Sequence, residues 1–385
     1  MTSVGVQRVR RGHLWLYEGH VAGVQGDPKA GDLVDLVDAR RRYIGRAFFN
    51  PKSKIRARLL TTQEEPIDER FWRARLEAAL RYRQRVVEGT TAYRLIHGES
   101  DWLPGLIVDR YDALLVLQTL SYGMDRRKPE LAAWLRELTG AVGVYERNES
   151  GTRSLEGLPR ARGLVSGEAP TLVEITEGAA HFRVDVAEGQ KTGWYCDQRE
   201  NRLGVAPYAK GLGVLEAFCH TGAFGIHAAL RGARSVEGLD SSEDAVAAAQ
   251  GHAELNRLSS VCRYRACDVF EALPALHRAG ERYGMVILDP PAFAKTKSAL
   301  PRALAGYKQI NLRALQLLAP EGVLVTCSCS HHVSAEALWQ VVADAADDAR
   351  RPIRLVEARG QARDHPILAG MPETNYLKCF VVQAL

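Results

Sequence analysis

The C-terminal half of the chain alternates short apolar runs with stretches in which apolar residues recur at helical spacing. The apolar runs lie at 212–217, 234–239, 262–266, 284–289, 322–327 and 376–383. Helical spacing occurs at 197–208, 222–232, 242–256, 302–318 and 334–349. Short apolar runs predict buried strands, and strands that alternate with helices predict a parallel, doubly wound α/β sheet. We expect one domain of this class over residues 179–385.

The first 178 residues follow two other patterns. Residues 1–63 carry short alternating segments broken by Gly and Pro, with three arginines at a predicted hairpin tip, 40–42. Residues 66–86 have a helical period, and the stretch that follows predicts a helix near 126–139 and strands at 106–111, 113–118, 142–146 and 171–175. We therefore expect a small β-rich domain at 1–63 and a central α+β domain at 64–178.

Basic residues are concentrated in the first predicted domain. Residues 1–63 hold 12 Lys and Arg against 5 Asp and Glu, whereas the other 322 residues hold 39 against 41. A small basic unit on a near-neutral body is typical of a nucleic-acid contact, and a solvated basic face is the alternative. The chain shows neither an apolar run long enough to cross a membrane nor a signal-peptide pattern, so we expect a cytoplasmic protein without a membrane partner.

The cysteine pattern favours neither a metal site nor a disulfide framework. The seven cysteines include no Cys-x-x-Cys pair, and their number is odd. Most are expected in the core as small apolar residues. Cys327 and Cys329, at the end of the strand predicted at 322–327, are the two that require closer examination.

A glycine-bearing turn at 215–225 joins the first strand of the predicted sheet to a helix. Its glycine spacing differs from the dinucleotide pattern Gly-x-Gly-x-x-Gly, so no pyrophosphate cradle is expected. Acids then follow two further strands, which suits the ribose and the adenine of an adenosyl ligand without phosphate. S-adenosylmethionine is that ligand. Singly, each residue could instead be a turn glycine or a helix cap. As a set, the expected contacts are Phe218, Thr221, Gly222, Asp240 at the ribose and Asp268 near the adenine amine, and Asp289 at the next strand end is expected to contact the cofactor as well.

The predicted strands at 284–289 and 322–327 both end in reactive residues. Ligands of open α/β sheets bind at the carboxyl ends of the strands, so Asp289 and Cys329 are expected to face one site. Pro290 and Pro291 make the loop after Asp289 rigid, and Phe293 is placed to stack on a flipped base. The Asp-Pro-Pro motif is similar to that of enzymes that methylate exocyclic amines of adenine or cytosine, and this likeness implies methylation of a nucleobase without identifying the atom.

The thiol favours carbon 5 of cytosine. This carbon is a poor nucleophile, and attack of a thiolate on C6 turns C5 into an enamine carbon that accepts a methyl group. An exocyclic amine needs no covalent help. We therefore predict Cys329 as the nucleophile and Asp289 as the group that hydrogen-bonds or protonates the ring at N3. Cys327 is expected to be a core residue.

Ordered motifs in all three predicted domains give the chain a family resemblance. They include Arg-Gly-His-Leu-Trp at 11–15, Ser-Lys-Ile-Arg-Ala-Arg at 53–58, and the segments 98–111, 189–199, 288–293, 307–311 and 328–330. In these motifs the chain resembles the RlmI-like bacterial 23S rRNA cytosine-C5 methyltransferases. That family combines an N-terminal PUA domain with a class I Rossmann-like S-adenosylmethionine domain.

The resemblance implies Cys329 as nucleophile, Asp289 as the acid beside it, a PUA domain that grips 23S rRNA through a basic face, and a homodimer. It also implies that residues 190–199 close over the methionine end of the cofactor, with Lys191, Asp197 or Gln198 in contact. The substrate contacts expected are Pro290, Phe293 and Lys191.

Two positions depart from the pattern. Position 327 is usually aromatic in the family. Position 292 is Ala, where RNA cytosine-C5 methyltransferases with two thiols use a cysteine to expel the product. Release must then use another base, such as Asp289 or water.

Two other functions stay open at this point. One is methylation of a guanine or an exocyclic amine by the same loop without a covalent step. The other is a non-catalytic RNA-binding or ribosome-assembly factor in which the methyltransferase domain is a relic.

Overall fold

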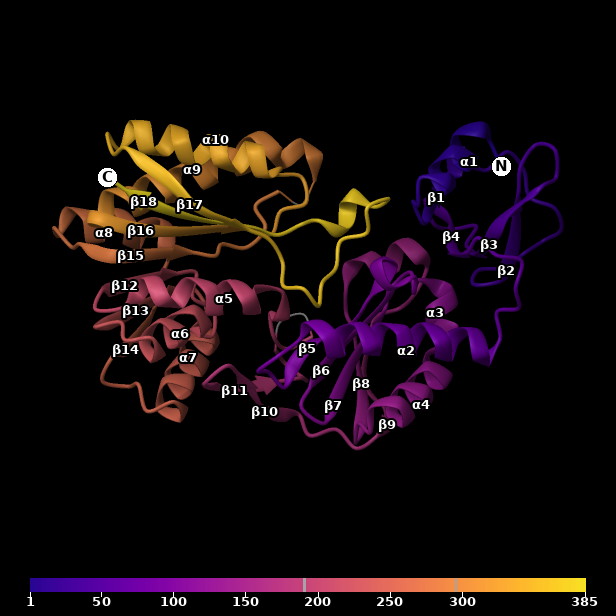
Figure 1. Cartoon of the computed structure of the whole chain (residues 1–385), viewed down its shortest axis with the longest axis horizontal. Coiled ribbons are helices and arrows are strands. Elements are labelled where there is room, and N and C mark those ends of the chain that lie inside the picture. The colour runs from indigo at the N-terminus through magenta and orange to yellow at the C-terminus, as the bar shows by residue number, and fades with distance from the viewer. Residues whose placement is uncertain (190–191, 295) are drawn as a thin grey trace. The chain divides into compact units, whose positions relative to one another are not determined.

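A computed structural model describes residues 1–189, 192–294 and 296–385 (Figure 1). The chain forms two compact units. The first comprises Met1–Ile175, Arg183–Cys196 and Arg363–Thr374. The second comprises Thr176–Phe182, Asp197–Ala362 and Asn375–Leu385. The boundaries of the three domains predicted above stay a prediction.

The N-terminal part of the first unit is a small antiparallel sheet preceded by a helix. Its strands pair in the order β1-β4-β3-β2 and are β1 (Trp15–Tyr17), β2 (Leu33–Val37), β3 (Tyr43–Phe49) and β4 (Ile55–Thr61). The predicted β-rich fold is confirmed, and the arginines at 40–42 lie in the β2–β3 turn, where Arg41 has a φ of 59°. The prediction omitted α1 (Ser3–Arg10), which buries only Gly5, Val6 and Val9 and therefore lacks a broad apolar stripe.

The rest of the first unit is built around a five-stranded sheet of order β5-β6-β7-β8-β9. The strands are β5 (Ala92–His97), β6 (Leu106–Tyr111), β7 (Leu114–Thr119), β8 (Gly143–Asn148) and β9 (Ala161–Gly167). The helices are α2 (Glu69–Val86), α3 (Tyr122–Arg126) and α4 (Lys128–Thr139). Buried residues of α2 and α4, such as Trp72 and Leu131, share one core with strand residues such as Leu115 and Val144.

The second unit contains a seven-stranded sheet of order β14-β13-β12-β15-β16-β18-β17. Its strands are β12 (Gly213–Ala217), β13 (Ser235–Asp240), β14 (Cys262–Ala266), β15 (Tyr283–Leu288), β16 (Leu318–Ser328), β17 (Ile353–Arg359) and β18 (Lys378–Ala384). Neighbours from β14 to β16 are parallel, but β18 is antiparallel to both β16 and β17. The prediction of an entirely parallel sheet was therefore wrong for β18, since an apolar run does not encode the direction of a strand.

Helices cover both faces of this sheet. On one face, α8 (Val269–Arg278), α9 (Leu300–Leu317) and α10 (Ala335–Asp348) pack against one another. On the other face lie α5 (Arg199–Val205), α6 (Ala223–Leu230) and α7 (Glu243–Leu255) (Figure 1). The doubly wound arrangement is thus confirmed.

Two elements of this unit were missed, and each has a physical reason. Pro274 lies inside α8, where a proline normally breaks a helix. Strand β17 is an edge strand without a single buried residue, so it has no apolar run.

A separate two-stranded sheet is formed by β10 (Leu172–Glu177) and β11 (Ala180–Asp185). No helix of the described residues is long and apolar enough to cross a membrane.

Candidate active site

The predicted cofactor turn follows β12 and has a constrained backbone. Phe218 and His220 adopt positive φ angles of 62° and 47°, and Gly222, the N-cap of α6, has a φ of 76°. A Cβ atom at position 222 would lie 2.6 Å from ring atoms of Tyr264. Gly222 is therefore required both for its φ angle and for the space that it leaves. A side chain is excluded at this point of the turn.

Asp240 fastens this turn to the carboxyl end of β13. Its Oδ2 accepts a hydrogen bond from the backbone N–H of His220 at 2.8 Å, and its Oδ1 accepts one from the backbone N–H of Ser242 at 3.0 Å. A carboxylate offers about four acceptor positions, so two stay available. Two acceptor positions fit the donor hydroxyls of a ribose, and the position of Asp240 therefore suits the role predicted for it.

Thr221 and Asp268 have structural partners of their own. The carbonyl oxygen of Thr221 accepts a hydrogen bond from Nδ1 of His252 at 2.9 Å. Asp268 is exposed and caps α8, because its Oδ1 accepts from the backbone N–H of Phe270 at 2.7 Å. The cap explains Asp268 without a ligand, and its contact with adenine stays a prediction.

Glu216, within β12, was not predicted as a site residue. Its carboxylate is buried and accepts hydrogen bonds from the backbone N–H groups of Phe224 at 3.1 Å and Gly225 at 2.9 Å. Burial raises the pKa of Glu216 to about 8, although both hydrogen bonds act in the opposite direction. Glu216 ties the first turn of α6 to β12 and so supports the loop between them. The signal in the sequence was an acid inside a strand that is otherwise apolar.

The structure brings Gln198 and Asp289 together. Nε2 of Gln198 donates a hydrogen bond to Oδ1 of Asp289 at 2.9 Å. Nδ2 of Asn201 donates to Oε1 of Gln198 at 2.6 Å, and Nε of Arg359 donates to Oδ1 of Asn201 at 3.2 Å. This chain of contacts fixes which way the Gln198 amide faces. Asn201 and Arg359 carry no motif that would have identified them.

Aromatic rings surround the loop after Asp289. The ring of Phe293 lies 4.7 Å from that of Tyr307, 5.9 Å from Phe270 and 6.5 Å from Phe218, centroid to centroid. Phe218 and Phe293 are half-buried, whereas Pro290 is buried. The predicted cofactor contact Phe218 and the predicted base-stacking residue Phe293 therefore belong to one aromatic cluster. Their contacts with ligands stay predictions.

Cys327 and Cys329, the two thiols at the end of β16, differ in their exposure. Cys327 is fully buried opposite Cys379 of β18, and its hydrogen bond with Cys379, together with burial, raises its pKa well above the usual value. Cys329 lies beyond the strand and is partly exposed. Cys327 is thus a core residue, as predicted, while Cys329 is accessible.

Hydroxyl groups hold the backbone around Cys329. Ser328 donates a hydrogen bond to the hydroxyl of Tyr307 at 2.9 Å, and the Tyr307 and Ser330 hydroxyls lie 3.0 Å apart. Lys378, which the sequence did not single out, donates from Nζ to the carbonyl oxygen of Ser330 at 2.8 Å. Cys329 therefore lies between two residues whose positions are fixed.

Two further predictions concern Lys191 and metal binding. Lys191 lies outside the described residues. Within the described residues, no cluster of three or more His, Cys, Asp or Glu side chains has the arrangement of a metal site.

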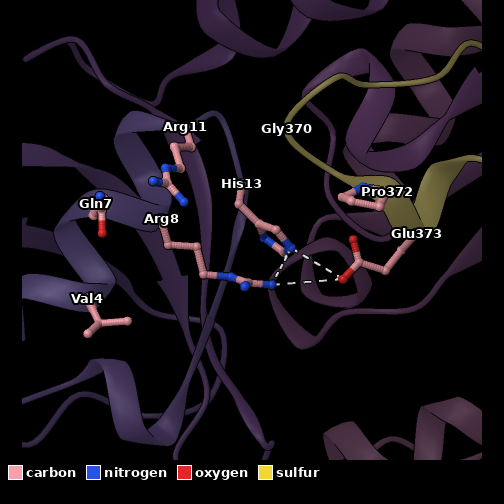
Figure 2. Close-up of a pocket in the computed structure, with 8 residues that line it drawn as sticks. All are labelled: Val4, Gln7, Arg8, Arg11, His13, Gly370, Pro372 and Glu373. Atoms are coloured by element: carbon pink, nitrogen blue, oxygen red, sulfur yellow. Dashed lines mark hydrogen bonds and ion pairs between the residues drawn. The ribbon is translucent and has the colours of Figure 1, made fainter. Parts of the chain in front are cut away.

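A second candidate site lies in the first unit. A cavity of about 320 Å³ is lined by Val4, Gln7, Arg8, Arg11, His13, Gly370, Pro372 and Glu373 (Figure 2). His13 Nε2 lies 3.3 Å from Oε1 of Glu373, and the Arg8 guanidinium lies 3.8 Å from the same oxygen. Burial lowers the pKa of His13, so the positive charges of the cavity come from its two arginines. The Glu373 carboxylate offsets one of these two charges, so the lining keeps a net charge of +1 toward an anion such as phosphate.

Comparisons with known proteins agree with this geometry. A PUA-like domain model matches residues 1–62, and a model of S-adenosylmethionine-dependent methyltransferases matches residues 147–368. A curated "Ribosomal RNA large subunit methyltransferase I" from Tolumonas auensis is 42% identical over 396 residues and covers 100% of both chains.

Solved structures show the same fold. A proposed SAM-dependent methyltransferase from Streptococcus mutans aligns with a TM-score of 0.85 at 21% identity, over 99% of this chain and 98% of that one. A proposed methyltransferase in complex with SAH aligns with a TM-score of 0.86 at 21% identity over the same shares. The predicted class I Rossmann-like fold and the predicted cofactor are thereby confirmed. The chain belongs to the S-adenosylmethionine-dependent methyltransferase family, in the group of its ribosomal RNA large subunit methyltransferase I relatives.

Proposed function

We propose that this protein methylates C5 of a cytosine in 23S ribosomal RNA, through a covalent intermediate on Cys329. The observation that carries the proposal is the placement of Asp289 and Cys329 after neighbouring parallel strands, β15 and β16, at one edge of the sheet. The name of the Tolumonas auensis relative supports a ribosomal RNA substrate. An accessible thiol at that edge favours a base carbon over an exocyclic amine.

The residues of the chain divide the work. S-adenosylmethionine supplies an electrophilic methyl group when bound, and the Gly222 turn with Asp240 would hold its adenosyl part. The thiolate of Cys329 forms a bond to C6 of the cytosine, and the electron pair of the C5–C6 double bond becomes available at C5. Asp289, oriented by Gln198, protonates the ring at N3, and the resulting carboxylate then accepts a hydrogen bond from N3–H.

The PUA-like segment would contribute RNA binding. Its net charge of +7 over residues 1–63 follows from 12 basic and 5 acidic residues. The cavity beside α1 presents Arg8 and Arg11 (Figure 2). A guanidinium group can donate two parallel hydrogen bonds to the oxygens of one phosphate. Such a contact holds the RNA backbone without reading the base sequence.

Nucleoside analysis of methylated rRNA tests the proposal. Unmodified 23S rRNA is incubated with the protein and S-adenosylmethionine that carries a labelled methyl group, and the RNA is digested to nucleosides. Labelled 5-methylcytidine is the expected product. A methylated guanosine or N4-methylcytidine would support the non-covalent alternative, and cofactor binding without any methylated nucleoside would support an assembly factor.

A further inference from the structure

Lys378 is a buried amine beside the proposed nucleophile. It lies at the start of β18, directly opposite Ser328 of β16, and is only 7% exposed. Its Nζ donates hydrogen bonds to two carbonyl oxygens, those of Ser330 and Tyr376, both at 2.8 Å. Of these two partners, Ser330 directly follows Cys329 in the chain, and Tyr376 lies just before β18. Within the mechanism described above, Lys378 has no role.

The two carbonyl partners determine what the amine can do. They occupy two of the three hydrogens of an ammonium group, or both hydrogens of a neutral amine. The remaining tetrahedral position then holds either the third proton or the lone pair. An amine in this setting can release and accept a proton while both structural hydrogen bonds persist.

The electrostatic surroundings make this exchange feasible near neutral pH. Burial lowers the pKa of Lys378 to about 8, and the negative charge of the Cys329 thiolate acts in the opposite direction. The geometry agrees, because Lys378 pairs with Ser328 across the sheet and donates to the carbonyl oxygen of Ser330, and these two residues flank Cys329. Burial of this kind is a common way to prepare a lysine for proton transfer.

The proposed reaction requires a base that has not yet been assigned. Once C5 has received the methyl group, it carries a hydrogen that must leave before the product can form. Position 292 is Ala, so no second thiol follows the Asp-Pro-Pro motif. Asp289 is engaged by Gln198 and is assigned to N3 of the ring.

We propose that Lys378 holds Cys329 as a thiolate in the resting enzyme and later removes the hydrogen from C5. This inference rests on the proposed function and adds a catalytic residue to the same site. Lys378 would thus act twice, before the bond between Cys329 and C6 forms and again when the hydrogen leaves C5.

The proton balance of the cycle closes. When the sulfur of Cys329 bonds to C6, its negative charge passes to the ring, and the ammonium, which no longer faces a thiolate, releases one proton to water. After methylation, the C5–H bond breaks and its proton goes to the lone pair of Nζ. The electron pair re-forms the C5–C6 double bond, the C6–S bond breaks, and sulfur leaves as a thiolate beside the new ammonium. One proton is released for each hydrogen replaced by a methyl group.

Two substitutions separate the two roles of Lys378. Lys378→Arg keeps the positive charge but cannot act as a base, because a guanidinium does not lose its proton in proteins. Lys378→Met removes both the charge and the base while keeping the length of the side chain. Lys308→Met is the matched control, because Lys308 of α9 is more exposed and forms an ion pair at 2.8 Å with Asp348, the last residue of α10.

Each variant is incubated with unmodified 23S rRNA and S-adenosylmethionine carrying a labelled methyl group, then resolved on a denaturing gel. Lys378→Arg is expected to accumulate a methylated protein–RNA adduct, with release of product slowed about 10²–10⁴-fold. Lys378→Met is expected to form that adduct more slowly, and Lys308→Met is expected to match the wild type. Circular dichroism and calorimetric binding of S-adenosylmethionine establish that the variants are folded.

The proposal is overturned if a folded Lys378→Arg protein releases 5-methylcytidine at the wild-type rate without an adduct. It is also overturned if the variant binds cofactor normally but is inactive and forms no adduct, since the base would then not be what is missing. Failure of the proposed function looks different, because the wild type itself would then produce no 5-methylcytidine.

Discussion

Gln198 donates a hydrogen bond to Asp289 across 2.9 Å, and this contact joins the start of α5 to the carboxyl end of β15. Gln198 is buried, and Asn201 in turn donates to its carbonyl oxygen. The amide nitrogen of Gln198 is therefore directed at the carboxylate. The proposed catalytic acid is thus held by a neutral amide donor.

Replacing Gln198 by Leu is expected to reduce kcat about 10–100-fold. A hydrogen bond to a charged group contributes about 1.5–3 kcal/mol, and without it Asp289 can rotate away from the ring. Methyl transfer at saturating rRNA gives kcat, and calorimetry gives the Kd for S-adenosylmethionine. An unchanged Kd with reduced kcat supports positioning of Asp289. A raised Kd with normal kcat would assign Gln198 to the cofactor instead, as the sequence suggested.

Substitution at Asp268 separates a helix cap from a cofactor contact. Asp268→Ser keeps an oxygen that can cap α8 but is too short to reach a ligand, whereas Asp268→Ala loses both. If Asp268 contacts the adenine amine, both variants should bind S-adenosylmethionine about 10–100-fold more weakly, because each loses one hydrogen bond to a charged group. Calorimetry decides the question. Wild-type affinity in the Ser variant would leave Asp268 with the cap alone.

Arg11 is expected to contact the RNA backbone from the cavity beside α1. Arg11→Ala should weaken rRNA binding at low salt and reduce the slope of log K against log salt by about 1, because one phosphate contact is lost. Filter binding at several salt concentrations measures this slope. Arg10→Ala is the control, since Arg10 is the exposed last residue of α1, next to Arg11 in the chain, but does not line the cavity. Equal slopes for the two variants would contradict a specific role of the cavity.

Glu177 should control the stability of the second unit at acid pH. Glu177 is buried, and its Oε1 accepts hydrogen bonds from Nε of Arg202 at 2.6 Å and from Nε2 of His227 at 3.0 Å. Burial alone would raise the pKa of Glu177, but Arg202 and His227 lower it well below the usual value. Because the folded pKa lies below the unfolded one, this stabilisation is present above about pH 4.5 and is lost as the pH falls.

Glu177→Gln is expected to lower the free energy of unfolding at pH 7 by about 3–5 kcal/mol, because it leaves Arg202 buried without its carboxylate. The variant should also lose less stability than the wild type between pH 5 and pH 3. Urea denaturation at both pH values measures each effect. Glu137→Gln, which breaks an exposed ion pair with Arg73, should change little. A Glu177→Gln protein as stable as the wild type would contradict this account.

The strand ends that carry the site were predictable, because buried parallel strands are continuous apolar runs with a sharp polar end. Asp240, Asp289 and Cys329 were all placed at the correct edge of the sheet for this reason. Gly222 was identified by its place in the turn, and the structure adds that Tyr264 fills the space beside it.

Side-chain contacts between distant segments were not predictable. The pairs formed by Gln198 with Asp289 and by Lys378 with the Ser330 carbonyl join positions that are 91 and 48 residues apart. The reversal of β18 brings Lys378 to the end of β16, and its direction depends on the connection that precedes it rather than on its own apolar residues. The base beside Cys329 therefore emerges only from the folded chain.

Trapping with 5-fluorocytidine tests the central claim most directly. A fluorine at C5 cannot leave as a proton, so the cycle should stop after methyl transfer with the RNA bonded to the thiol. Wild type and Cys327→Ala, incubated with 5-fluorocytidine-substituted 23S rRNA and S-adenosylmethionine, should each form an adduct that resists denaturation, and Cys329→Ala should form none. An adduct with Cys329→Ala, or no adduct with a wild-type protein that methylates ordinary rRNA, would contradict covalent catalysis by Cys329.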